Sequence, residues 1–212
     1  MYKNKRKTFD SNIITNTNST LDCNSIIYYD SRDNSKINVT NNHIYFNATI
    51  NDNSIYNLIK CINNIIELKN KDYDKTIILH INSMGGILKY IINFINYINT
   101  IEYFIISIIG NHCNDTAIVL ACSCNYRIIK KKSQIILSYY NYSNYSNYSN
   151  SSNIYWGLYN QELPHNDFIC LLTSIFNSVL HIQENKIEQY LQQTKVFNAK
   201  KYKKMKLVDE IV

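Results

Sequence analysis

The chain has 212 residues, of which 45% are apolar and 18% charged, and its formal net charge is +6. This composition can bury one sizeable core, and no run reaches the roughly 18 apolar residues that a membrane-spanning helix needs. Lys and Arg are scattered over several segments, with two clusters at residues 130–132 and 200–206 that lack interleaved aromatic stacking motifs. We expect these clusters to be solvated faces, and we therefore expect no nucleic-acid partner and no membrane partner.

Residues 1–25 differ in composition from the rest of the chain. They are polar, rich in Asn, Thr and Ser, and basic at the start. This predicts a flexible leader, followed by one folded domain over residues 26–212. The leader lacks the apolar run of a secretory signal, and its character fits either the remnant of an organelle transit region or an ordinary disordered segment.

Strand and helix patterns alternate through the folded domain. Strand composition predicts strands at residues 44–50, 76–80, 103–109 and 135–137. Helical spacing of apolar residues predicts helices at 53–68, 87–101, 114–123, 167–193 and 199–206. Three successive alternations imply right-handed crossovers, so the sequence predicts an α/β fold with a mainly parallel sheet.

Residues 139–155 interrupt this pattern, because Asn-Tyr-Ser is repeated three times between Asn141 and Ser149. A low-complexity tract of this kind predicts a loop expansion. The six cysteines lack zinc-site spacing, and Cys122 and Cys124 are expected to pack around the end of the helix at 114–123. We therefore expect free thiols, no metal and no cofactor.

Two short motifs carry the chemistry. Residues 81–86 read Ile-Asn-Ser-Met-Gly-Gly, and residues 110–116 read Gly-Asn-His-Cys-Asn-Asp-Thr. A glycine turn that exposes backbone amides, followed by a nucleophile on a sharp turn into a helix, is typical of peptide hydrolysis. Here the expected position of the nucleophile holds Asn114, an amide with no acidic proton.

Four segments in the same order resemble ClpP, the proteolytic subunit of Clp protease. They are residues 43–50, 76–86, 110–123 and the closing Leu-Val-Asp-Glu-Ile-Val at 207–212. The resemblance implies the ClpP/crotonase-like fold of repeated ββα units with a mainly parallel sheet and a helical handle. Residues 139–155 would then be an insertion in the handle region.

The resemblance also assigns the catalytic positions. The family's nucleophilic serine aligns with Asn114, its histidine with Ser138 and its orienting acid with Lys195. The two oxyanion-hole amides align with Gly86 and Asp115. All three triad groups are replaced, so we expect no catalytic residue. Read without the resemblance, Asn114 and Asp115 simply suit the start of a helix, where they cap free amides and favour the helix dipole.

The function that the resemblance implies is that of a pseudoprotease. The chain is similar to the catalytically inactive ClpR subunit, which implies a heptameric ring of identical or mixed subunits with active ClpP, docking of a Clp AAA+ ATPase, and the stroma of a plastid-type organelle such as the apicoplast. Two alternatives stay open. One is a rewired acyl hydrolase or crotonase-like enzyme that retains Gly86 and Asp115, and the other is a regulatory binding module.

Four further sets of residues bear on the question of activity. Ser138 with Lys195 forms a pair that is catalytic in some hydrolases, and His112 lies beside the thiol of Cys113. We expect neither pair to act, and we expect Cys113 to pack in the core. His80 falls where active relatives present an aromatic residue for docking the ATPase. His43, His165 and His181 have no partner that the sequence reveals, so we interpret them as incidental.

Overall fold

The computed structural model describes residues 26–30, 35–68, 75–114, 116–137, 170, 173–177 and 195–212. Within these residues, nine strands form one sheet. The strands are β1 (Ile26–Asp30), β2 (Ser35–Thr40), β3 (His43–Asn47), β4 (Thr76–Ser83), β5 (Phe104–Cys113), β6 (Tyr126–Ile129), β7 (Gln134–Leu137), β8 (Lys195–Asn198) and β9 (Glu210–Ile211). The helices with defined bounds are α1 (Asp52–Leu68), α2 (Lys89–Ile98), α3 (Thr116–Cys122) and α7 (Ala199–Lys204).

The centre of the sheet is parallel. Its main path runs β1-β2-β3-β4-β5-β6-β9, and β3, β4, β5, β6 and β9 pair in parallel. Two antiparallel hairpin pairs, β1–β2 and β2–β3, extend one side. On the other side β7 pairs with β5 in parallel and with β8 in antiparallel orientation. The predicted α/β fold with a mainly parallel sheet is confirmed.

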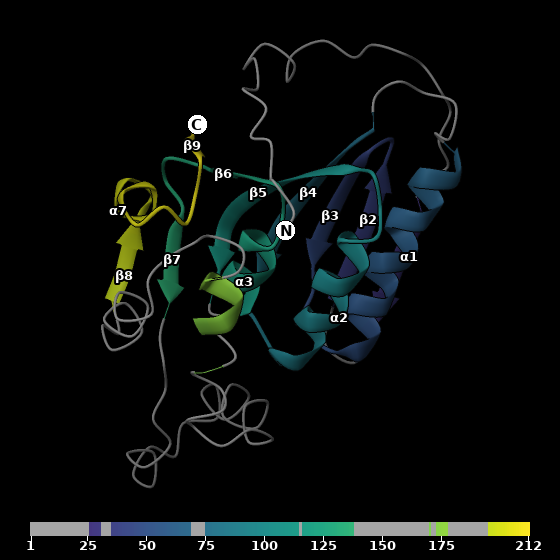
Figure 1. The fold of residues 1–212 in the computed structure, drawn as a ribbon, viewed down its shortest axis with the longest axis horizontal. Coiled ribbons are helices and arrows are strands. Elements are labelled where there is room, and N and C mark those ends of the chain that lie inside the picture. The colour runs from purple at the N-terminus through teal and green to yellow at the C-terminus, as the bar shows by residue number, and fades with distance from the viewer. Residues whose placement is uncertain are drawn as a thin grey trace, which may run out of the picture.

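Helices α1, α2 and α3 cover one face of the sheet, as Figure 1 shows. Alternate residues of β3 and β4 point into this core, and Ile44, Phe46, Ile77 and Leu79 are fully buried. Helix α1 meets them with an apolar stripe at helical spacing, made of Ile55, Leu58, Ile62 and Ile65. The residues of β3 and β4 that alternate with these buried ones lie on the opposite face of the sheet.

Local hydrogen bonds explain where the helices begin and end. Before α1, the Ser54 amide donates to Asn51 Oδ1 at 2.8 Å, and the Asn51 amide donates to Ser54 Oγ at 3.0 Å. This reciprocal cap satisfies amides that the first helical turn leaves open. Before α7, Asn198 Oδ1 accepts from the Lys201 amide at 3.0 Å.

The end of α7 has an unusual residue at the position where the chain reverses. Lys206 adopts φ 63°, and the Leu207 amide donates to the Tyr202 carbonyl at 3.1 Å. This is the hydrogen bond of a Schellman motif, in which glycine normally occupies the left-handed residue. The reversal turns the chain into β9 and buries Leu207 and Val208.

Several predicted boundaries were inaccurate. The strand expected to end at residue 80 continues to Ser83, and the helix expected at 114–123 begins at Thr116. The helix expected at 87–101 spans Lys89–Ile98. Strands β1, β2, β6, β8 and β9 were missed by the sequence patterns. The described residues 170 and 173–177 are helical, while the rest of the predicted helix at 167–193, residues 1–25, the tract at 139–155 and the expected handle lie outside the described residues.

Candidate functional site

The glycine turn after β4 is held by Ser83. Its hydroxyl donates to the Ala48 carbonyl at 2.6 Å and accepts from the Gly85 amide at 3.1 Å. Ser83 is only 3% exposed, so these bonds are shielded from water. The hydroxyl therefore ties the turn to the chain that follows β3, which gives Ser83 a structural role.

Gly86 lies directly against Ile50. The two residues form a parallel bridge, in which the Ile50 amide donates to the Gly85 carbonyl at 2.8 Å and the Ile87 amide donates to the Ile50 carbonyl at 2.8 Å. Gly86 has φ 150°, and a Cβ built on it would stand 2.1 Å from the Ile50 carbonyl oxygen. Only glycine fits here, both for its conformation and for the space.

The bridge also fixes the direction of the Gly86 peptide groups. Because the bonds to Ile50 use the flanking Gly85 and Ile87, the amide and carbonyl of Gly86 itself lie along the other edge of the turn. On that edge Thr116, the first residue of α3, donates from its hydroxyl to the Gly86 carbonyl at 3.1 Å. The Gly86 carbonyl therefore faces the start of α3.

Asn114 occupies the turn between β5 and α3. Its amide donates to the Ser83 carbonyl at 3.1 Å, and its carbonyl accepts from the Ala117 amide at 2.9 Å. Its side-chain Nδ2 lies 3.5 Å from the sulfur of Met84, and the residue is 8% exposed. The sequence-predicted juxtaposition of Asn114 with the glycine turn is present in the structure.

The segment before Asn114 is aligned by the end of β4. The side-chain Oδ1 of Asn82 accepts from the His112 amide at 3.1 Å. A Cβ on Gly110 would stand 2.8 Å from the Ile81 carbonyl oxygen, so the two strands approach too closely for a larger residue. Gly110 thus brings the turn that carries Asn114 against the glycine turn.

The other predicted site residues are described only in part. Lys195 begins β8, and its backbone pairs with Leu137 of β7. Ser138 follows Leu137 in the sequence and lies outside the described residues, as does Asp115. The backbone register therefore places Lys195 opposite Leu137, the last residue of β7 and the neighbour of Ser138 in the sequence.

The neighbouring pair His112 and Cys113 is separated by strand geometry. His112 is exposed, whereas Cys113 is fully buried in the core cluster. Successive residues of a strand point to opposite faces, so the imidazole and the thiol do not face each other. Cys113 packs in the core, as predicted. Cys122 and Cys124 are buried around the end of α3, and burial raises the pKa of each thiol to about 12.

The face of the sheet away from the helices carries a cluster that the sequence did not reveal, made of His43, Tyr45 and His80. His43 Nδ1 lies 2.9 Å from His80 Nε2, and the Tyr45 ring stacks on the His80 ring with centroids 4.4 Å apart. The interpretation of His43 as incidental is wrong, because it has His80 as a partner. A single sequence cannot show this pairing, since it depends on the register between β3 and β4.

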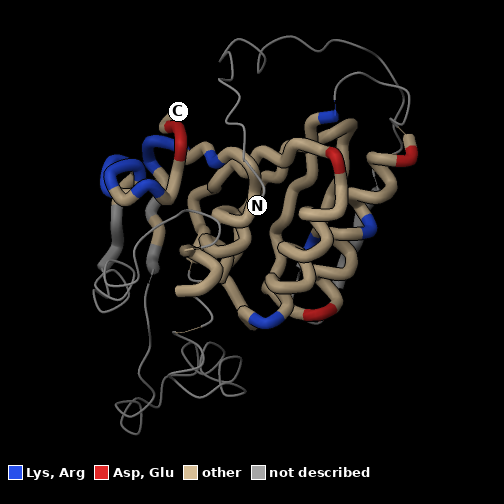
Figure 2. The backbone as a smooth tube through the Cα atoms, viewed as in Figure 1, with Lys and Arg blue, Asp and Glu red and all other residues tan. Residues whose placement is uncertain are grey.

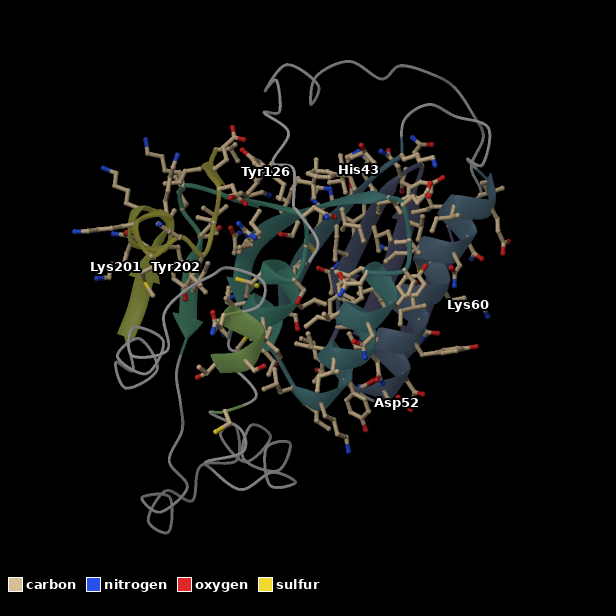
Figure 3. The ribbon with its side chains drawn as sticks, viewed as in Figure 1. His43, Asp52, Lys60, Tyr126, Lys201 and Tyr202 are labelled. Carbon is tan, nitrogen blue, oxygen red and sulfur yellow. The ribbon has the colours of Figure 1, made fainter. Side chains whose placement is uncertain are left out.

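The surroundings of His80 favour its neutral imidazole. Partial burial, followed by the proximity of His43 and of Lys130, lowers the pKa of His80 from 6.5 to about 4. Figure 3 shows His43 and Tyr126 at the same end of the sheet, in agreement with their shared register row through Ile78 and Ile106. The His80 imidazole is therefore neutral near neutral pH, within a partly exposed cluster of three rings.

Metal and membrane chemistry find no support in the described residues. Within them no three His, Cys, Asp or Glu side chains gather as a metal site would require. No helix in the described part of the chain has the length and hydropathy to cross a bilayer.

An α/β fold with a glycine turn set against a strand-to-helix turn defines the class of ClpP-like proteins. The family model described as Clp protease matches residues 30–212, so the chain belongs to the Clp protease family. No curated protein matches the sequence significantly.

Solved structures from Plasmodium falciparum share the fold. A crystal structure described as a peptidase is 22% identical, covers 81% of this chain and 95% of its own, and superposes with a TM-score of 0.59. The catalytic domain of a ClpP protease from the same organism is 18% identical, with coverage of 79% and 83% and a TM-score of 0.60. At these identities the likeness supports the fold alone.

Proposed function

We propose that this chain is a non-catalytic subunit of a Clp protease complex, comparable to ClpR. It assembles into a heptameric ring, with identical copies or with active ClpP, and contributes to the architecture of an ATP-dependent protease that a Clp AAA+ ATPase serves. We assign it to the stroma of a plastid-type organelle such as the apicoplast, for which the basic start of the sequence and the plasmodial relatives of its fold give support.

The observation that carries the proposal is the carboxamide of Asn114 beside the glycine turn. Acyl transfer at this position needs a side chain that can lose a proton and attack a carbonyl, and a carboxamide does neither. The bonds around Asn114 serve the fold: its amide joins β5 to Ser83, and its carbonyl accepts from the first turn of α3. The turn therefore retains its architecture without a nucleophile at Asn114.

Ser138 and Lys195 stand where the family has its catalytic histidine and acid, and these replacements also argue against catalysis. Removing one member of a catalytic triad lowers the rate by about 10⁴- to 10⁶-fold, because the three groups act as a unit. A chain with all three positions replaced would keep at most the electrostatic contribution of backbone donors such as Gly86. Selection for turnover does not account for such a chain, whereas a role in assembly does.

The activity test uses the purified chain, a fluorogenic peptide and a serine-reactive fluorophosphonate. We expect no turnover and no labelling of the wild type, and none of Asn114→Ser, because a serine without its base remains unactivated. A triple variant, Asn114→Ser with Ser138→His and Lys195→Asp, rebuilds the family triad and serves as the positive control. Circular dichroism and native mass of each variant exclude loss of the fold as the reason for inactivity.

The outcome that overturns the proposal is measurable turnover of the wild type that Ser138→Ala abolishes and Asn114→Ala does not. That result would identify Ser138 as a nucleophile, with Lys195 as the candidate base. Calorimetric binding of an acyl-CoA, lost in a variant of Asn114, would instead favour the crotonase-like alternative.

The assembly test is native mass spectrometry of the chain alone and mixed with an active ClpP from the same cells. We expect rings of seven subunits in one or both samples. A chain that remains monomeric under both conditions would contradict the structural role even if the activity test found no turnover.

A further inference from the structure

Eight lysines gather at the β6–β7 turn and on α7, and we call this surface the lysine corner. They are Lys130, Lys131, Lys132, Lys200, Lys201, Lys203, Lys204 and Lys206. All eight are exposed, while the apolar residues of the same segment, Tyr202 and Met205, are 0% and 3% exposed. Helix α7 thus buries its apolar side and presents a row of ammonium groups to solvent.

The fold unites two clusters that are about 70 residues apart in the sequence. The Lys131 amide donates to the Val212 carbonyl at 2.6 Å, and the Val212 amide donates to the Ile129 carbonyl at 2.9 Å, so the β6–β7 turn is tied to the end of β9. Helix α7 precedes β9 and packs against it. Figure 2 shows the two basic segments side by side at one end of the molecule.

The lysine corner holds more positive charge than the net charge of the chain. The sequence has 22 Lys and Arg against 16 Asp and Glu, and setting the eight lysines aside leaves 14 against 16, a net charge of −2. Basic residues that are scattered over several segments of the sequence are therefore partly gathered in space, and the eight lysines are solvated as predicted. A surface with this segregation of charge has a strong local potential that attracts anions.

Two carboxylates close in sequence to α7, those of Asp209 and Glu210, are bonded to residues of β6. Asp209 accepts from the Arg127 guanidinium at 2.8 Å and from the Arg127 amide at 3.0 Å. Glu210 accepts from the Tyr126 hydroxyl at 3.3 Å. These bonds direct the Asp209 and Glu210 side chains toward β6.

We propose that the lysine corner binds an acidic segment, rich in Asp and Glu, of a protein partner. Lysine ammonium groups on flexible stems suit carboxylates spaced along a mobile chain, because each ammonium acts as an independent point charge. The inference goes beyond the proposed function and does not depend on the absence of catalysis.

The composition of the lysine corner favours this partner over two others. Nucleic-acid surfaces combine arginines with exposed aromatic rings that stack on bases, whereas the lysine corner contains no arginine and Tyr202 is buried. Interfacial helices insert large apolar side chains into a bilayer, whereas the apolar residues of α7 face the core.

The test measures fluorescence anisotropy of a labelled ten-residue Glu/Asp peptide with the full chain at several salt concentrations. We expect saturable binding that weakens steadily with salt. The double variant Lys203→Gln with Lys204→Gln, and separately Lys131→Gln with Lys132→Gln, should each weaken binding about tenfold, because two exposed charge pairs are lost.

The matched control is Lys36→Gln with Lys60→Gln, which removes the same charge from exposed positions elsewhere. Equal weakening by the control would show that net charge alone attracts the peptide, and would overturn the proposal. Tighter binding of a single-stranded oligonucleotide of equal charge, or of vesicles containing phosphatidylserine, would also overturn it. So would the absence of peptide binding at low salt by a chain whose circular dichroism shows that it is folded.

Discussion

The guanidinium of Arg127 donates to the carboxylate of Asp209 at 2.8 Å, across 82 residues of sequence. The pair is largely buried, since the two side chains are 11% and 30% exposed. The backbone amide of Arg127 donates to the same carboxylate, so Asp209 joins β6 to the segment that enters β9. The aspartate of the closing Leu-Val-Asp motif therefore has a structural role, since it holds the last segment of the chain against β6.

Replacing Asp209 should destabilise the protein strongly. Asp209→Ala leaves a buried guanidinium without its partner, and we expect the free energy of unfolding to fall by about 3 kcal/mol. The exposed pair Lys75–Glu102, whose side chains are 52% and 85% exposed, supplies the control. Glu102→Ala should cost about 0.5 kcal/mol or less. Urea denaturation of both variants measures the difference, and equal losses would contradict a stabilising role for Asp209.

Gly86 should not tolerate any side chain. In Gly86→Ala the new Cβ meets the Ile50 carbonyl oxygen and the backbone holds φ 150°, so we expect a loss of about 3 kcal/mol or more, or failure to fold. Met84→Ala in the same turn is the control, because Met84 is 46% exposed. It should change stability by about 1 kcal/mol or less. A Gly86→Ala protein as stable as the wild type would contradict the close contact between Gly86 and Ile50.

Lys206 offers the opposite result, a gain in stability. Because its φ is 63°, Lys206→Gly removes a conformational cost and should raise the free energy of unfolding by about 0.5–1 kcal/mol. Lys204→Gly removes the same charge from the last turn of α7 and should lower it by about 1 kcal/mol. Thermal unfolding separates the two variants, and a shift in the same direction for both would rule out this account.

The His43–His80 pair should make stability depend on pH below neutrality. The pKa of His80 is lowered from 6.5 to about 4, chiefly by burial, so the folded protein disfavours its protonation. Above pH 6.5 this residue is neutral in both the folded and unfolded chains and contributes no penalty. Between about pH 6.5 and 4 the unfolded chain binds the proton first, so the free energy of unfolding falls as the pH decreases.

His80→Phe keeps a ring beside Tyr45 and removes the titrating group. Urea denaturation across about pH 7 to 4.5 should show a flatter dependence for this variant than for the wild type. His112→Ala, which removes an exposed histidine, serves as the control and should retain the slope of the wild type. An unchanged slope in His80→Phe would assign the pH dependence to other groups.

The sequence was most informative where a pattern repeats within one element. Apolar spacing located α1 within one residue of its start, and β-branched runs located the cores of β4 and β5. Strands β1 and β2 have only five and six residues, and β6 has only four, so neither composition nor length distinguished them from loops. Their pairing depends on partners that are distant in sequence.

The backbone turns of the candidate site could be predicted from the sequence, whereas the side-chain contacts between distant segments could not. The glycine motif predicted a turn with exposed backbone amides beside a turn into a helix, and the structure brings Gly86 and Asn114 to adjoining turns. The partnership of His43 with His80 and the union of the two lysine clusters were not predictable. Both depend on strand register and on the path of the final segment, which a single sequence does not specify.

The tight contact between Gly86 and Ile50 has a consequence for recognising activity in related sequences. Steric exclusion at Gly86 and the positive φ of both glycines demand a Gly-Gly pair in this place before any reaction is considered, so the pair will survive in copies that have lost hydrolytic chemistry. Surveys that score peptidases by their glycine signature would count such copies as active. The identity of the side chain at position 114 is the more informative discriminator.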